Sequence, residues 1–274
     1  MQVLSEPDVV GLLDRLMAEV LPSRRGLAAW RALLRSHATV MRQLDAAVGH
    51  ASVPSSVRRF GFWSAMATAI TYAVFLVGYF IGSYLRPPWD IAIPVAASIL
   101  IAPSFVLLTV GIHYATPESK RIWSHAAMAF ALLYAAFVSI VYVTWLFVVE
   151  PHVLNHSRSA VAPFVFKRGS FVQMLDGLGY TYMSLAVSLT AGVFTGGRLA
   201  RWIRGVAVAS APAAIGVFTS YVLFTPPYDL LGLPGTLLTL VYAVLLAVHF
   251  RRAAPVPGRP TQPWPEPSVP AARS

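Results

Sequence analysis

A short polar series within an otherwise apolar stretch offers the best candidates for chemistry in this chain. Asp176, Tyr180 and Ser184 are spaced four residues apart, and this spacing places them on one face of a helix. An ionisable side chain inside an apolar helix is costly to bury, and such residues commonly mark a functional site. We therefore expect Asp176 to move a proton, hold a cation or serve as a general acid. The alternative is a structural role, in which Asp176 is hydrogen-bonded to tyrosine or to the preceding loop.

A second group of candidates precedes this helix. Tyr142 lies on the aromatic face of the preceding apolar stretch, which leads up to Glu150, and His152 follows two residues later. If the two stretches pack as a hairpin, Glu150 and Asp176 would share an outward-facing pocket. The predicted pocket residues are then Asp176, Glu150, Tyr180, Ser184, Tyr142 and His152.

Metal and cofactor chemistry is not predicted. The chain contains no cysteine, which excludes disulfides, thiolate catalysis and Cys-based zinc sites. His152 and His156 have a spacing that suits two metal ligands on a helix, but the sequence places no third ligand. Phosphate-binding loops, nucleophile elbows, zinc-protease motifs and dinucleotide fingerprints are absent. We expect no metal and no cofactor.

The elements that must position the candidate residues are six long apolar stretches. The 274 residues are 57% hydrophobic and 12% charged, about half of the charge that a soluble domain carries. A helix that spans a bilayer needs roughly 20 mostly apolar residues. The pattern predicts an all-α polytopic bundle of six transmembrane helices within residues 60–250, at 60–85, 91–115, 123–149, 172–195, 202–224 and 230–250.

The positive charges predict how this bundle is oriented. All of the 21 Lys and Arg residues except Arg86, Arg158, Lys167 and Arg168 fall on one side of the predicted membrane. Cytoplasmic connections retain positive charge, so both termini should be cytoplasmic, and the net charge of +10 need not indicate nucleic-acid binding. Arginine far outnumbers lysine, which suggests a GC-rich bacterial genome. The expected location is therefore the bacterial inner (plasma) membrane, with the lipid bilayer as partner.

Two flanking segments differ from the bundle in composition. Residues 1–59 are predicted to be a cytoplasmic amphipathic helical segment, and residues 251–274 a Pro-rich disordered tail. The first segment contains the run Ala-Trp-Arg-Ala-Leu-Leu-Arg-Ser-His at 29–37 and Val-Met-Arg-Gln-Leu-Asp at 40–45. Residues 29–48 resemble the first helix of MarR-type transcription regulators, which serves dimerisation in that family.

The MarR resemblance implies self-association, and a homodimer through residues 26–48 is one expectation. The alternative interpretation is a helix that lies on the inner leaflet with its arginines toward lipid headgroups. Both interpretations use the apolar face of this segment, and the sequence does not decide between them. No winged helix-turn-helix follows, so no nucleic-acid partner is expected. The residue pattern of the membrane portion resembles that of uncharacterised bacterial multi-span membrane proteins. This resemblance implies no activity.

Three functions are compatible with the sequence. The leading one is a non-catalytic membrane protein that binds or passes a small molecule, lipid or proton through an outward pocket near Asp176. The alternative is a membrane-embedded enzyme that acts on a lipid or isoprenoid and needs the carboxyls of Asp176 and Glu150 close together. The third is an interaction module, in which residues 1–59 dimerise or recruit a partner.

Overall fold

The computed structural model describes residues 53–223, 225 and 228–253. Side chains at 228 and 229 are outside this description. The predicted MarR-like helix lies outside the described residues, and so do nearly all of the amphipathic segment and the Pro-rich tail.

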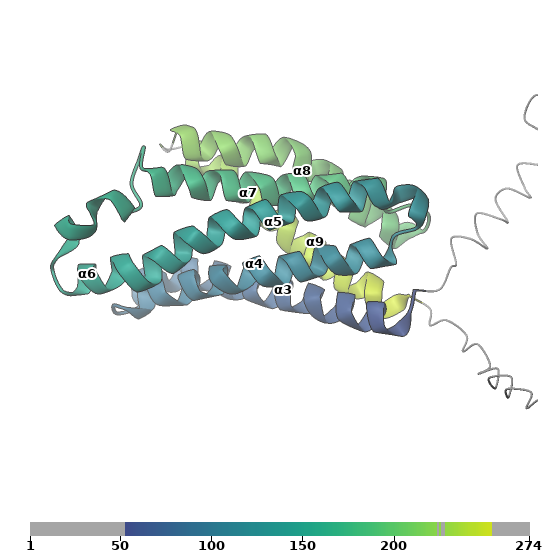
Figure 1. Ribbon diagram of the computed structural model, residues 1–274, viewed down its shortest axis with the longest axis horizontal. Helices are drawn as coiled ribbons and strands as arrows, with labels where there is room; N and C mark the ends of the chain where they lie inside the picture. The colour runs from purple at the N-terminus through teal and green to yellow at the C-terminus, as the bar shows by residue number, and fades with distance from the viewer. Residues whose placement is uncertain (1–52, 224, 226–227, 254–274) are drawn as a thin grey trace, which may run out of the picture. The chain divides into compact units, whose positions relative to one another are not determined.

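Long helices dominate the described residues, which contain no strand (Figure 1). They are α3 (Ser55–Ile81), α4 (Trp89–Ala115), α5 (Arg121–Thr144), α7 (Phe171–Leu189), α8 (Arg198–Leu223) and α9 (Leu233–Arg252). Short helical elements connect them: η1 (Gly82–Tyr84), η2 (Glu118–Lys120), the π-helix η3 (Trp145–Val149), α6 (Glu150–Leu154), η4 (Arg158–Phe164), η5 (Thr190–Gly192) and η6 (Tyr228–Gly232). The prediction of an all-α bundle is confirmed for these residues.

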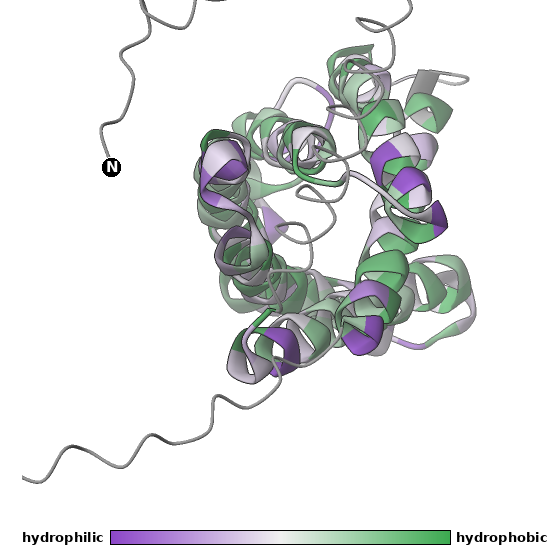
Figure 2. Ribbon diagram, turned by 90° about the vertical axis from the view of Figure 1, so that its right-hand side faces the viewer, coloured by the Kyte–Doolittle hydropathy of each residue, from purple (hydrophilic) through white to green (hydrophobic). Residues whose placement is uncertain are grey.

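Successive long helices run in alternate directions, so α3 begins at the end of the bundle where α9 finishes (Figure 1). The Arg58 guanidinium donates a hydrogen bond to the Ala253 carbonyl across 3.5 Å at this end. We call it the terminal end. The opposite end, which carries η1, α6 and η4, is the distal end. Seen from the terminal end, the helices surround a common axis (Figure 2).

Five helical segments are long and apolar enough to cross a membrane: Ser55–Tyr84, Trp89–Ala115, Glu118–Leu154, Arg198–Leu223 and Leu230–Arg252. The fourth predicted span, 172–195, is not among them, so the prediction of six spans is met only in part. The helix that forms there, α7, is shorter, and it carries polar residues that include Gln173, Asp176 and Ser184, all buried. It packs between α5 and α8, which buries its polar side inside the bundle.

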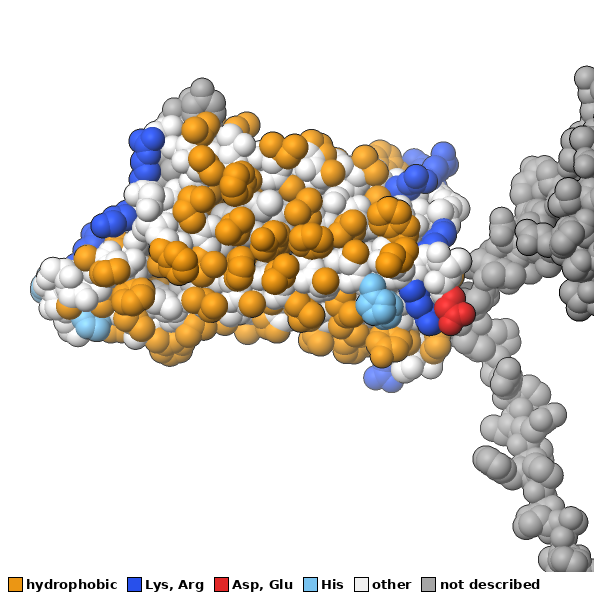
Figure 3. All heavy atoms as spheres, turned by 45° about the horizontal axis from the view of Figure 1, so that its top comes forward, with side chains coloured by type: hydrophobic (Ala, Val, Ile, Leu, Met, Phe, Trp, Pro, Cys, Tyr) orange, Lys and Arg blue, Asp and Glu red, His pale blue; other side chains and the backbone are white. Residues whose placement is uncertain are grey.

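The exterior of the bundle is apolar along the helix middles. Large side chains such as Val77, Leu100, Ile140 and Ile215 are exposed there. On the face shown in Figure 3, hydrophobic side chains cover the middle, and Lys and Arg gather toward the two ends. Soluble monomers rarely expose so much contiguous apolar surface. The described bundle therefore has the surface of a membrane protein.

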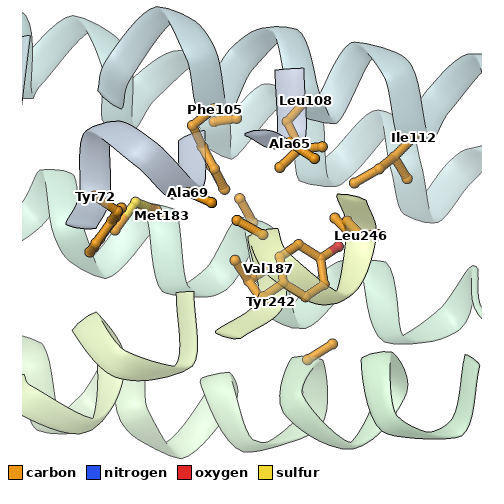
Figure 4. Packing of buried hydrophobic residues seen from close by; sticks show 14 of the residues in the cluster. Ala65, Ala69, Tyr72, Phe105, Leu108, Ile112, Met183, Val187, Tyr242 and Leu246 are labelled. Carbon is orange, nitrogen blue, oxygen red and sulfur yellow. The ribbon is translucent and has the colours of Figure 1, made fainter. Parts of the chain in front are cut away.

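The core is closely packed from the terminal end toward the bundle centre. Figure 4 shows Ala65, Leu108, Ile112 and Leu246 meeting between α3, α4 and α9. A Cβ atom added at Gly61 would lie 2.5 Å from the Phe250 ring, so only glycine allows α3 and α9 to approach this closely. Close approach through small residues is a common way for helices to associate within a membrane.

Candidate functional site

The packed core gives way to a cavity of about 660 Å³ in the distal half of the bundle. Residues from all six long helices line it, together with Trp145 of η3 and Phe166 of the connection before α7. Its floor includes Tyr72 and Met183, which lie side by side at the edge of the core (Figure 4). The cavity is a cleft that is partly open to the surroundings. The wall is rich in aromatic side chains: Tyr72, Phe75, Tyr79, Phe80, Tyr142, Trp145, Phe166, Tyr180 and Tyr221.

Asp176 is the more deeply buried of the two carboxyl groups that line this cavity, with only 1% of its surface exposed. The Tyr221 hydroxyl donates a hydrogen bond to Asp176 Oδ2 across 2.7 Å. Gly177 permits this geometry, because a Cβ atom at that position would lie 2.6 Å from Tyr221 Cβ. The Tyr142 hydroxyl is also near the carboxyl, but Oδ1 has no hydrogen-bond partner among the described residues.

Local sequence fixes the start of α7 and hence the position of Asp176. Ser170 is the N-cap of the helix, and its hydroxyl accepts a hydrogen bond from the Gln173 backbone N–H. This satisfies one of the free donors at the helix start. The buried Gln173 side chain adds two 2.7 Å hydrogen bonds, accepting from Gly169 N–H and donating to the Tyr221 carbonyl. Asp176 follows one turn later, where the hydrogen bond from Gln173 to the Tyr221 carbonyl joins α7 to α8.

A group of tyrosines continues the wall toward the centre of the bundle. The hydroxyls of Tyr142 and Tyr180 lie 3.2 Å apart. The Tyr180 ring packs on Tyr134, with ring centroids 5.8 Å apart, and Tyr134 packs on Phe105. The Tyr134 hydroxyl is buried and makes no hydrogen bond to the described residues.

Several other buried polar atoms around the cavity have no hydrogen-bond partner among the described residues. Those on lining residues are Tyr72 Oη, Asp90 Oδ1, Trp145 Nε1 and Asp176 Oδ1. Buried polar groups in proteins are almost always paired with protein, water or a bound molecule. The cavity therefore offers both acceptors and a donor to whatever occupies it.

The π-helix η3 adds a further aromatic side chain to this wall. Segments of π-helix are rare within α-helices and often occur at functional sites. Trp145, the first residue of η3, lines the cavity. Its ring packs edge-on against Phe166, with centroids 6.0 Å apart, and Phe166 packs edge-on against Tyr221. These three rings link α5, α8 and the connection before α7 beside Asp176.

The structure brings four of the six predicted pocket residues to the cavity: Asp176, Tyr180, Ser184 and Tyr142. Glu150 and His152 are not lining residues, which corrects their predicted place in this pocket. Val149, Val161 and Val165 form a separate small apolar cluster. Glu150 is the residue after Val149 in the chain. It is only 5% exposed, while His152 is bonded through Nδ1 to the Val148 carbonyl at 2.7 Å. Both residues lie in α6, directly after the π-helix η3.

A second carboxyl does line the cavity, but it is Asp90. The N-cap of α4 is Pro88, which makes no side-chain capping bond. Asp90 instead lies second in the helix, close enough to Glu150 for their charges to interact. Tyr72, Tyr221 and Asp90 come from distant parts of the chain, so no local spacing could have revealed their place in the wall.

Among the described residues, no three His, Cys, Asp or Glu side chains are grouped so that they could hold a metal ion. The cavity is therefore characterised by its aromatic wall and its unpaired polar atoms. Comparison with known proteins adds no relative to this geometry: no protein-family model, curated protein or solved structure matches the chain.

Proposed function

We propose that this chain is an integral protein of a bacterial inner membrane that binds a small, mostly apolar molecule in the distal cavity. The observation that carries the proposal is the coexistence of an aromatic-walled cavity of about 660 Å³ with buried polar atoms that have no hydrogen-bond partner among the described residues. Ligand sites are typically mostly apolar concavities with a few placed polar groups. The proposed activity is binding or carriage of the molecule, without chemical conversion.

The proposed topology has six spans, with α7 as the fourth. It is supported by the alternating course of the long helices and by the position of α7 between α5 and α8. Lys120, Arg121, Arg251 and Arg252 lie at the terminal end, which the positive-inside tendency assigns to the cytoplasm. The cavity then belongs to the outward half of the membrane.

The rival function is a membrane-embedded enzyme that acts on a lipid or isoprenoid. It requires joint action by the carboxyls of Asp176 and Glu150. Glu150 is not a lining residue of the cavity that holds Asp176. Binding is the better-supported function for this reason.

The binding proposal can be tested with a series of probes that share one rigid apolar cage. We suggest 1-aminoadamantane (a cation at neutral pH), 1-adamantanol (neutral) and 1-adamantanecarboxylate (an anion), with thermal unfolding of the purified protein in detergent as the readout. A ligand that binds only the folded state raises the melting temperature in a saturable way. At least one probe should do so for the wild type.

A matched pair of variants separates cavity binding from solution of the probes in the micelle. Leu76 lines the cavity, so Leu76→Trp should fill part of it and abolish the shift. Leu132 is 53% exposed on α5 and does not line the cavity, so Leu132→Trp should keep the shift. Equal shifts in both variants, or no saturable shift with any probe, would overturn the proposal.

A further inference from the structure

We propose that the molecule bound in the distal cavity is an organic cation, whose ammonium group pairs with Asp176 while its apolar body lies against the aromatic wall. This inference rests on the proposed function, because it names the chemistry of the ligand for the same cavity. Three independent observations support it: the charges of the wall, the free carboxylate oxygen and the aromatic rings.

The charges of the wall are of one sign. Asp90 and Asp176 line the cavity, and its lining contains no Lys, Arg or His among the described residues. This occurs in a chain whose formal net charge is +10, so the basic residues lie elsewhere. In a low-dielectric site a uniform sign of charge selects strongly for ligands of the opposite sign.

The Asp176 carboxyl has room for one more partner. The Tyr221 hydroxyl occupies Oδ2 and the Tyr142 hydroxyl lies near the carboxyl, while Oδ1 is buried and no donor in the described part of the chain makes a hydrogen bond to it. Burying a carboxylate without compensation is costly, and an ammonium group compensates it with both a charge and N–H donors. A ligand hydroxyl would supply the donor but not the charge.

The aromatic wall suits the same kind of ligand. Tyr72, Tyr142, Trp145 and Tyr180 line the cavity together with Asp176. Ring faces attract cations, and the attraction strengthens where water is excluded. The same rings give apolar contact to the rest of the molecule. A carboxylate beside several aromatic rings thus recognises both parts of an amphipathic amine.

The exposed lining residues indicate where such a ligand enters. Tyr79 and Phe80 of α3 are 66% and 63% exposed, and Leu233 at the start of α9 is 40% exposed. At the terminal end, α3 and α9 are instead closed by the contact of Gly61 with Phe250. We therefore place the entrance between the distal ends of α3 and α9, on a side of the bundle that faces lipid. An amphipathic amine that partitions into the outer leaflet would reach it directly.

The test compares affinities within the adamantane series by titrated thermal shift at neutral pH. We expect 1-aminoadamantane to bind the wild type at least about tenfold more tightly than 1-adamantanol, a difference of about 1.4 kcal/mol, and 1-adamantanecarboxylate to bind least. Asp176→Asn should remove most of the preference for the cation and leave the affinity for 1-adamantanol within about twofold. Asparagine keeps the size of the side chain and a hydrogen-bonding group but removes the charge.

The outcomes distinguish this inference from the proposed function beneath it. If no probe binds, the proposed function fails and the inference fails with it. If the neutral and cationic probes bind the wild type equally, the cavity binds ligands but the inference is wrong. Asp176 could hold a proton instead of a cation, and then Asp176→Asn would leave the affinities of both probes unchanged, which also contradicts the inference.

A second variant keeps the test decisive if Asp176→Asn does not fold. Asp90 lies at the start of α4 and is only partly buried, so Asp90→Asn removes one wall charge with less risk to the core. It should weaken 1-aminoadamantane binding about two- to fivefold by loss of longer-range attraction and leave 1-adamantanol binding unchanged. Equal loss for both probes would indicate a structural role and would oppose the inference.

Discussion

The two halves of the bundle differ in how completely side chains fill their interior. In the terminal half, apolar side chains fill the interior, and α3 meets α9 at Gly61 and Phe250. In the distal half, the same helices leave a cavity of about 660 Å³, and several polar atoms around it have no hydrogen-bond partner in the described ranges. The first half holds the helices together, and the second contains the space in which we propose that a ligand binds.

Tyrosine shows the difference most clearly. Tyr242, near the terminal end, shares a 2.6 Å hydrogen bond with Thr190 and is fully buried. Tyr134, beside the cavity wall, is equally buried but has no hydrogen-bond partner among the described residues. A buried polar group is retained without a partner at a cost of free energy. That cost is understandable if the distal half is selected for binding and not for stability alone.

The largest expected contrast between the halves comes from shortening one leucine in each. Leu108 is completely buried in the core, and large-to-small substitutions at such sites cost about 2–5 kcal/mol. Leu76 lies on the cavity wall and is partly buried, so it already faces open space. Leu108→Ala should lower the melting temperature in detergent by several degrees more than Leu76→Ala does. Similar losses at both sites would show that the two halves are packed alike.

Two glycines provide a smaller contrast in the terminal half. A methyl group at Gly61 would lie 2.5 Å from Phe250, whereas nothing lies within 4 Å of a methyl group at Gly205 in α8. Overpacking costs about 1–3 kcal/mol, while Gly→Ala in a helix gains about 1 kcal/mol where the methyl is free. Gly61→Ala should therefore lower the melting temperature, and Gly205→Ala should maintain or raise it. A stable Gly61→Ala protein would show that the contact between α3 and α9 is loose.

Removing one hydroxyl from each region should give the smallest effect. Tyr242→Phe loses its bond to Thr190 and should cost about 0.5–1.5 kcal/mol. Tyr134→Phe removes a hydroxyl that has no partner among the described residues, so stability should stay equal or increase slightly. Thermal unfolding of the two variants side by side provides the measurement. A clear loss of stability in Tyr134→Phe would mean that water or a ligand already satisfies that hydroxyl.

The sequence predicts the helices better than it predicts the cavity, because the two depend on different ranges of the chain. Apolar runs are local signals, and the run at 172–195 predicts the start of α7, at Phe171, to within one residue. The spacing of Asp176, Tyr180 and Ser184 also places these side chains on one wall. By composition alone, however, α7 is not apolar enough to count as a membrane-spanning helix. Its polar residues can be accommodated because α7 packs against α5 and α8.

The rest of the cavity depends on contacts between distant parts of the chain. Tyr221 reaches Asp176 from α8 only because Gly177 has no side chain. Asp90 takes the place in the wall that was predicted for Glu150. The π-helix at Trp145 has no recognised sequence signal, and it precedes the short helix α6, whose residues Glu150 and His152 do not line the cavity. No spacing rule contains this information.

The central claim, an accessible cavity that prefers cations, can be tested by attaching reagents to one introduced thiol. The natural chain has no cysteine, so Thr236→Cys would place a single thiol on the cavity wall. Ser159→Cys, on the exposed surface of η4, provides a matched control outside the cavity. Methanethiosulfonate reagents of similar size with trimethylammonium or sulfonate heads differ mainly in charge.

The measured quantity is the ratio of the two labelling rates at neutral pH. For each thiol we take the labelling rate with the cationic reagent divided by the rate with the anionic reagent. We predict that this ratio is at least about tenfold larger for Thr236→Cys than for Ser159→Cys. Adding Asp176→Asn should bring the two ratios together. The account would be contradicted if the thiol at 236 reacted with neither reagent, or if it reacted with the same charge ratio as the thiol at 159.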